Sequence, residues 1–206
     1  DSTIPVYPDW IKGIACALGS AGLAFLYSGD MIAFIVTVIC SLIGYFGRTL
    51  SVRFGCNEYV GIAIGGFAAM VSAYGFYSHI EQDSLVYVLV CCTLFMIPGV
   101  PLINSVIDTI NNHILSGITR AIRTILIVGS MTLGMAMALY FSPMPAFSFV
   151  DIKPHVLSIE QIIGSFTAAA SFAVLFNAPV RLLVSIGIGG VLCAVSYTHL
   201  RAHETL

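Results

Sequence analysis

Charged residues are scarce in this chain of 206 residues. Asp, Glu, Lys and Arg together make up 9% of the sequence, whereas hydrophobic residues make up 58%. A soluble domain contains about a quarter charged residues, so this composition excludes an ordinary soluble fold. Long apolar stretches cross membranes as helices, because a helix satisfies its own backbone hydrogen bonds. We therefore expect an all-α fold, a polytopic transmembrane helical bundle embedded in a lipid bilayer.

Basic patches and metal-ligand clusters are missing as well. The eight Lys and Arg residues are scattered singly and the formal net charge is −2, so the chain offers no surface for nucleic acid. The six cysteines form no CxxC pair and have no histidine at ligand spacing, which indicates apolar packing residues and no metal site. No nucleophile stands beside a base in the pattern, so we expect neither an enzyme nor a bound cofactor.

Seven apolar segments are candidates for membrane spans, since roughly 20 apolar residues cross a bilayer. They lie near residues 10–28, 31–47, 59–78, 84–107, 121–142, 159–178 and 181–197. The polar, proline-containing stretch 143–158 is interpreted as an external linker between a five-span unit, 1–142, and the start of a second unit, 159–195. The polar stretch 196–206 cuts the last span short, and we interpret it as a non-native tail.

Pro98, Gly99 and Pro101 interrupt the fourth segment. Proline removes a backbone donor and disfavours helix in the residue before it, so this stretch frees carbonyl groups from the helical ladder. Broken helices at membrane depth are tolerated where protein buries them or where they line a wet cavity, and transporters place substrate and ion sites on them. The interruption therefore predicts a substrate or coupling site at a broken fourth helix.

Asn104 and Asp108 follow the interruption, one helical turn apart on the same face. An acid beside an apolar span is costly unless it is hydrated or paired, so Asp108 is a candidate for function. Its carboxylate suits the ammonium group of an amino acid, and the Asn104 amide suits the polar atoms of the same substrate. Two alternatives stay open: Asp108 carries a proton, or it is a helix-end acid that lies near Arg120 or Arg123.

A second interruption, Asn177-Ala178-Pro179, is followed by Arg181. Asn177 and Arg181 are candidates for contact with a substrate. The alternative interpretation is a simple helix end whose arginine is anchored at the lipid headgroups.

These motifs resemble the bacterial threonine/serine exporter family, which also includes paired-subunit members associated with dicarboxylate export. The resemblance rests on the PGVPL segment from Pro98 with Asn104, Asp108, Ser116-Gly117 and Arg120, and on Tyr7-Pro8-Asp9-Trp10, Ile43-Gly44-Tyr45 and the segment from Val174 to Arg181. Two departures are visible. The family's cytoplasmic N-terminal region does not precede Asp1, so we expect a fragment, and the basic residue expected before the aspartate is Ile107 here.

The resemblance implies secondary transport of threonine and serine out of the cytoplasm, coupled to the proton gradient, across the bacterial inner membrane. The alternatives are an exporter of a dicarboxylate such as succinate and a non-transporting membrane subunit of a transport complex. Either a partner subunit or a homo-oligomer is compatible with this resemblance.

The distribution of basic residues predicts the orientation, because cytoplasmic loops carry the excess of Lys and Arg. When the basic residues are counted at alternate ends of the spans, they divide unequally between the two sides of the membrane. One side has Lys153, and the other side has Lys12, Arg48, Arg53, Arg120, Arg123 and Arg181. We therefore expect a cytoplasmic N-terminus, with the region of Asp108 on the same side.

Overall fold

The computed structural model of the chain describes residues 7–28, 30–80, 82–142 and 159–204, so the expected linker 143–158 lies outside the described residues. These described parts consist of helices joined by short turns, without a strand, which confirms the all-α prediction. The α-helices are α1 (Asp9–Ser28), α2 (Met31–Arg53), α3 (Glu58–Gly75), α4 (Gln82–Cys91), α5 (Gly99–Ile110), α6 (Ile114–Phe141), α7 (Ile159–Leu175) and α8 (Val180–Glu204), with the short 3-10 helices η1 (Tyr77–His79) and η2 (Leu94–Met96).

The number of spans differs from the prediction. By length and composition α1, α2, α6 and α8 can each cross a bilayer, and α4 with α5 makes a fifth candidate if this pair, bent by 54°, counts as one broken span. Helices α3 and α7 are present where spans were predicted, but they are shorter, with 18 and 17 residues. A bundle of membrane-capable helices is therefore confirmed, whereas the count of seven spans is not.

Helix α6 begins at Ile114, earlier than the predicted start of the fifth span near residue 121. The predicted span began directly after Arg120, with Arg123 inside it. In the structure both arginines lie inside the helix. The helix therefore extends beyond its apolar part.

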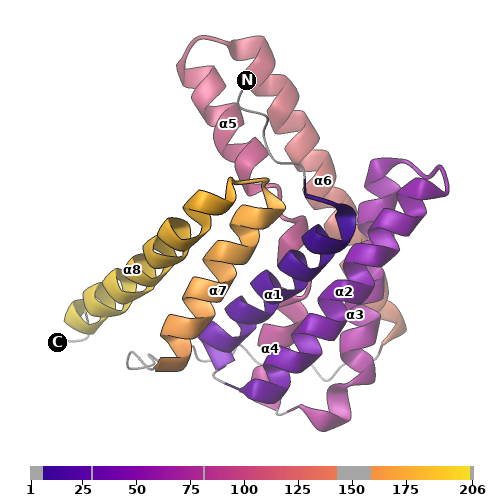
Figure 1. The fold of residues 1–206 in the computed structure, drawn as a ribbon. Helices are drawn as coiled ribbons and strands as arrows, with labels where there is room; N and C mark the ends of the chain where they lie inside the picture. Colours follow the sequence, from indigo (N-terminus) through magenta and orange to yellow (C-terminus); the bar gives the residue numbers. More distant parts are fainter. Residues whose placement is uncertain (1–6, 29, 81, 143–158, 205–206) are drawn as a thin grey trace.

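The helices are arranged as a row with α4 against one side of it. Neighbours in the row are α8, α7, α1, α2, α3 and α6 in that order, and each packs against the next. Helix α4 contacts α1, α2 and α3, while α5 packs against α6 in a hairpin that extends beyond the ends of the other helices (Figure 1). Helix α7, from the expected second unit, therefore packs directly onto α1.

Glycines allow two of these helix pairs to approach closely. A Cβ atom on Gly22 of α1 would lie 2.9 Å from the carbonyl oxygen of Gly164 on α7, and one on Gly164 would lie 2.8 Å from the Gly22 oxygen. Gly44 on α2 and Gly65 on α3 have the same reciprocal relation, at 3.0 and 2.8 Å. Close backbone contacts between small residues provide the packing that holds helices together in lipid.

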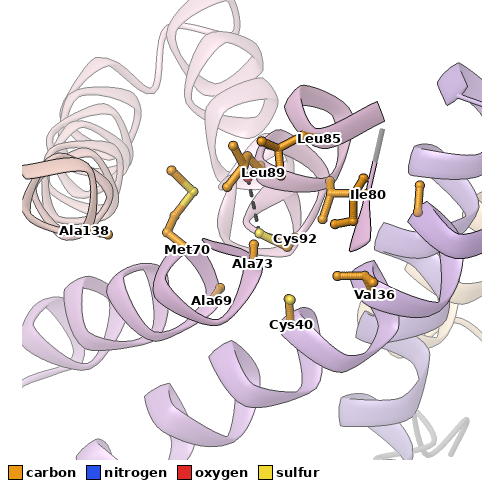
Figure 2. Packing of buried hydrophobic residues seen from close by; sticks show 12 residues of the cluster. Val36, Cys40, Ala69, Met70, Ala73, Ile80, Leu85, Leu89, Cys92 and Ala138 are labelled. Carbon is orange, nitrogen blue, oxygen red and sulfur yellow. Dashed lines mark hydrogen bonds between the residues drawn. The ribbon is translucent and has the colours of Figure 1, made fainter. Parts of the chain in front are cut away.

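Two apolar clusters form the interior. The first cluster lies between α2, α3, α4 and α6, and in it the Cys92 thiol donates a hydrogen bond to the Leu89 carbonyl at 3.2 Å (Figure 2). Cys40 of α2 belongs to the same cluster (Figure 2). The second cluster contains residues of α1, α2, α3, η2 and α6, namely Cys16, Tyr45, Ile62, Phe95, Met96, Ile127 and Met131. These cysteines pack as small apolar residues.

Large apolar side chains cover the outer faces of the bundle. On α2, Ile35, Ile39 and Ile43 are exposed one turn after another along a single stripe. A contiguous apolar surface of this kind on a soluble protein would mark an interaction site, whereas on a membrane protein it contacts lipid. The outer surface therefore agrees with the composition of the chain.

The close contact between α1 and α7 predicts how two glycine substitutions differ. Gly164→Ala forces backbone atoms apart, so we expect it to lower the free energy of unfolding by about 1–3 kcal/mol. Gly129→Ala on α6 is the matched control, since a Cβ atom there meets nothing within 4 Å. The control is expected to keep or raise stability, because alanine favours helix over glycine by about 1 kcal/mol. Thermal unfolding in detergent measures both variants. Equal stability of the two would contradict the close contact.

Candidate functional site

Helix α4 ends earlier than the sequence predicted. The prolines indicated an interruption at Pro98, but α4 stops at Cys91, and a turn and η2 follow before α5 begins. Thr93 contributes to this end, because its hydroxyl donates to the Val90 carbonyl at 2.9 Å and so occupies an acceptor of the helical ladder. The predicted break in the fourth helix is confirmed, and its start is corrected to Cys91.

The prolines instead begin α5. Pro98 has φ −81° and ψ 59°, the values of an inverse γ-turn, and the Gly99 amide donates across it to the Ile97 carbonyl at 2.9 Å. Gly99 is the first residue of α5, and Pro101 lies in its first turn. The missing N–H of proline has little effect there, because the first amides of a helix have no partner inside it. Part of the backbone that was expected to be free is therefore bonded within the break.

Protein buries most of the break, although Ile97 is exposed. Phe95 and Met96 of η2 are buried in the second cluster, where the Phe95 ring centroid lies 6.2 Å from that of Tyr45. Met96 occupies the space that a side chain on Gly65 would need, since a Cβ atom there would lie 2.5 Å from Met96 Cε. Pro98 is buried as well. Small residues thus leave room for a non-helical segment inside the bundle, where membrane proteins tolerate it.

Asp108 forms an ion pair across the α5–α6 hairpin. Its Oδ2 lies 3.2 Å from Arg120 Nε and accepts a hydrogen bond from the Ser116 hydroxyl at 2.8 Å, and 22% of its side chain is exposed. The basic partner that the resemblance expected next to the aspartate, where Ile107 stands, therefore comes from α6. Asn104 lies one turn before Asp108, half-buried, and makes no side-chain hydrogen bond to a described residue.

The turn between α5 and α6 positions this ion pair. Asn112 adopts a left-handed conformation with φ 60°, which asparagine tolerates better than most residues. The amides of Asn112 and His113 donate to the Thr109 and Asp108 carbonyls at 3.2 and 2.8 Å, the pattern of a Schellman motif. Gly117 then lets α6 approach α5, because a Cβ atom there would clash with the Thr109 side chain. Arg120 follows one turn later and faces Asp108.

A layer of charged side chains covers the second cluster. The Glu58 carboxylate of α3 lies between two arginines, 3.4 Å from Arg48 of α2 and 2.9 Å from Arg123 of α6. Glu58 stands one turn from Ile62, a member of the cluster, so these charges lie next to it. Partly exposed ion pairs each contribute about 1 kcal/mol or less, but together they join the three helices α2, α3 and α6. Sequence reasoning missed Glu58, although an acid after an Asn57 N-cap is a recognisable signal.

Asn177 and Arg181 lie at the turn between α7 and α8. Asn177 has φ 58°, and its amide and that of Ala178 donate to the Val174 and Ala173 carbonyls, so it ends α7 in a second Schellman motif. Its side-chain Oδ1 is buried and has no hydrogen-bond partner among the described residues. Arg181 is exposed in the first turn of α8 and forms no ion pair within the described ranges.

The predicted site residues fall into two sets. Pro98, Gly99, Pro101, Asn104 and Asp108 belong to α5 or its start, whereas Asn177 and Arg181 belong to the α7–α8 turn. No hydrogen bond or ion pair between described residues joins the two sets. Both sets lie at the end of the bundle that carries the charged layer. The short turn between α5 and α6 and the short turn between α7 and α8 are both at that end.

Many secondary transporters are bundles of membrane helices that contain broken helices in their interior. Comparison with known proteins gives a particular family, because the family described as "Putative threonine/serine exporter" matches residues 1–142. The chain belongs to this family.

Two curated relatives carry the name "Probable succinate transporter subunit YjjP", one from Escherichia coli (strain K12) and one from Klebsiella aerogenes. Each is 25% identical to this chain, over a match that covers 65% of the chain and 52% of the relative. The chain thus spans about half the length of the curated relatives that it matches. No solved structure is significantly similar to it.

Proposed function

We propose that this chain is the membrane part of a bacterial exporter that moves threonine and serine out of the cytoplasm, coupled to the proton gradient. The observation that supports this proposal most is the break between α4 and α5, which passes through the interior of the bundle beside the second cluster. Broken helices inside a bundle provide backbone groups that bind solutes and ions in transporters. The description of the family points to the same activity.

In this proposal Asp108 and Asn104 receive the substrate. Asp108 already holds a cation, since its carboxylate is paired with Arg120. The ammonium group of an amino acid would replace Arg120, and the Asn104 amide would bond the polar atoms of the substrate. Pro98, Gly99 and Pro101 would set the direction in which α5 presents these two side chains. In the alternative role, protonation of Asp108 would release Arg120 and so couple transport to the proton gradient.

A dicarboxylate is the second candidate substrate, because cations outnumber acids at this end of the bundle. The described residues there include the acids Asp9, Glu58 and Asp108 and the bases Lys12, Arg48, Arg53, Arg120, Arg123 and Arg181. A surplus of positive charge attracts anionic solutes to a site. Arg181 and the neighbouring Asn177 would contact a carboxylate in this case. The names of the two relatives favour the same candidate.

The proposal includes an orientation and a second membrane unit. The charged end of the bundle would face the cytoplasm of the cell, with the chain in the bacterial inner membrane. Helices α7 and α8 would form the start of the second unit, which would act together with a partner subunit. If this chain is instead a non-transporting subunit, proteoliposomes that contain it alone will show no flux until the second chain is added.

Substitution of Asp108 tests the proposed substrate site. Asp108→Asn removes the charge and keeps the size, so counterflow of labelled serine and threonine into proteoliposomes should fall about tenfold or more. Asp9→Asn is the matched control, because Asp9 is an acid at the same end that pairs with Arg53 at 2.7 Å. The control should keep the wild-type rate.

Other outcomes of this experiment separate the remaining roles of Asp108. Retained exchange with lost proton-driven flux would assign Asp108 to coupling rather than to binding. Wild-type exchange and wild-type driven flux together would show that Asp108 is only a helix-end acid, and would contradict its role in the proposal. Labelled succinate in the same assay decides between the two candidate substrates.

The orientation has its own test. Cys56 is exposed in the turn between α2 and α3, and His79 is exposed in η1 at the opposite end of α3. The test uses single-cysteine variants of the protein in intact cells or right-side-out vesicles. A membrane-impermeant maleimide should label His79→Cys from outside. The same reagent should label Cys56 only after the membrane is opened. Labelling of Cys56 from outside would reverse the proposed orientation.

A further inference from the structure

Helices α1 and α7 are related by an approximate two-fold axis. A Cβ atom on Gly19 of α1 would lie 3.3 Å from Ser171 Cβ on α7, and one on Gly22 would lie 2.8 Å from the Ala168 backbone nitrogen. Ser171 stands 149 positions after Gly22, and Ala168 stands 149 positions after Gly19. Exchanging each residue with the one 149 positions away therefore turns one contact into the other. Residue numbers fall along α7 as they rise along α1, so the helices are antiparallel and the axis is perpendicular to them.

The same shift of 149 positions matches the sequences of the two helices. Every glycine, alanine and serine of α7 coincides with a glycine, alanine, serine or cysteine of α1, between Ala15 and Ala24. The next helix begins at Met31 after α1 and at Val180 after α7, again 149 positions apart. Agreement of contacts, small residues and helix starts is what an inverted repeat produces, and many transporter folds are built from such repeats.

Helix α2 has two faces besides the one that packs against α1. The buried face, which contacts α3 and α4, contains Val36, Cys40 and Gly44. A Cβ atom on Gly44 would lie 3.0 Å from the carbonyl oxygen of Gly65 on α3. The other face is the exposed aliphatic stripe of Ile35, Ile39 and Ile43. One face of α2 thus binds helices, and the other is directed to lipid.

Helix α8 has both of these faces, but among the described residues neither is covered. It stands at the outer end of the row, packed against α7 (Figure 1). The equivalents of the buried face of α2 are small residues one turn apart, namely Ser185, Gly189 and Cys193. A Cβ atom on Gly189 would meet nothing within 4 Å, and Cys193 is exposed. The equivalents of the exposed stripe are large and 51–61% exposed, namely Val184, Ile188 and Leu192.

The chemistry of the small face indicates what covers it. Small residues let a second helix backbone approach closely, and they are enriched where membrane helices pack against one another. On α2 the equivalent face receives α3, whose contacting residues are Gly61, Gly65 and Ala69, four positions apart. The expected occupant of the α8 face is therefore an apolar helix with glycine or alanine at every fourth position.

We propose that α7 and α8 repeat α1 and α2 with inverted topology, and that the face of Ser185, Gly189 and Cys193 binds the helix of the second unit that corresponds to α3. This inference rests on the second membrane unit of the proposed function and identifies the surface on which that unit is completed. By the same two-fold relation, a helix corresponding to α4 contacts α7 and α8, since α4 contacts α1 and α2. The broken helix of the first unit then has a counterpart that runs in the opposite direction across the membrane.

Tryptophan substitutions test which face of α8 is covered. Cys193→Trp places a bulky side chain on the small face, whereas the matched control Leu192→Trp places it on the aliphatic stripe. In membrane vesicles from the source bacterium, Cys193→Trp should lower counterflow of labelled serine and threonine about tenfold or more, because closely packed helices cannot accommodate tryptophan. Leu192→Trp should keep the wild-type rate, since its side chain extends into lipid. Equal rates for the two variants, at equal amounts of inserted protein, would overturn the proposal.

Photo-crosslinking in the same membranes tests the contact without transport. A diazirine amino acid of the size of leucine at position 193 should crosslink to an apolar helix with glycine or alanine at every fourth residue, which mass spectrometry identifies. The same amino acid at position 192 should attach to lipid. Attachment to lipid at both positions, or a crosslink from position 193 to α8 of a second copy, would overturn the proposal. If the wild-type protein carries neither serine nor threonine, the proposed export function fails, and the crosslink at position 193 still decides whether the face binds this helix.

Discussion

The structure depends on one constraint, which is that backbone groups inside a membrane bundle must find partners within the protein. Helix α4 ends at Cys91, so the following residues run through the bundle without a helical ladder. They meet the constraint by local bonds, such as those of Thr93 and Gly99, and by burial against α1, α2 and α3. Burial is sterically possible because Gly65 leaves space for Met96. A side chain at position 65 would occupy the place of the Met96 methyl group.

The same constraint orders the polar parts of the bundle into layers. The second cluster lies in the interior, and the charged layer around Glu58 covers that cluster. Helix pairs α1–α7 and α2–α3 are held by backbone contacts between glycines, whereas the charged layer is held by partly exposed ion pairs of about 1 kcal/mol or less each. A movement that opens the interior of the bundle toward the charged end would therefore separate the ion pairs and keep the glycine contacts.

The sequence predicted the helices well and their tertiary relations poorly. Each of the seven predicted segments contains an α-helix. The number of spans is not confirmed, because the length of a helix depends on where charged residues such as Arg120 are accommodated. Pro98 indicates the break but not its start, because Pro98 immediately precedes α5 and a proline such as Pro101 is compatible with the first turn of a helix. The pairing of Asp108 with Arg120 and the orphan hydroxyls of Ser20 and Ser41 require a fold, since nothing local distinguishes these residues from others. Asn177 was recognised as special, and its left-handed backbone gives a structural reason for it.

In the proposed function, solute meets the backbone of the bundle at the break in the fourth helix. Hydrogen exchange of the segment from Cys91 to Ile97, measured by mass spectrometry on the protein in lipid nanodiscs, tests this role of the break. We expect these amides to exchange faster than those in the middle of α2, and we expect saturating threonine to slow their exchange. Exchange as slow as in α2, with no effect of threonine, would contradict a role of the break in binding solute.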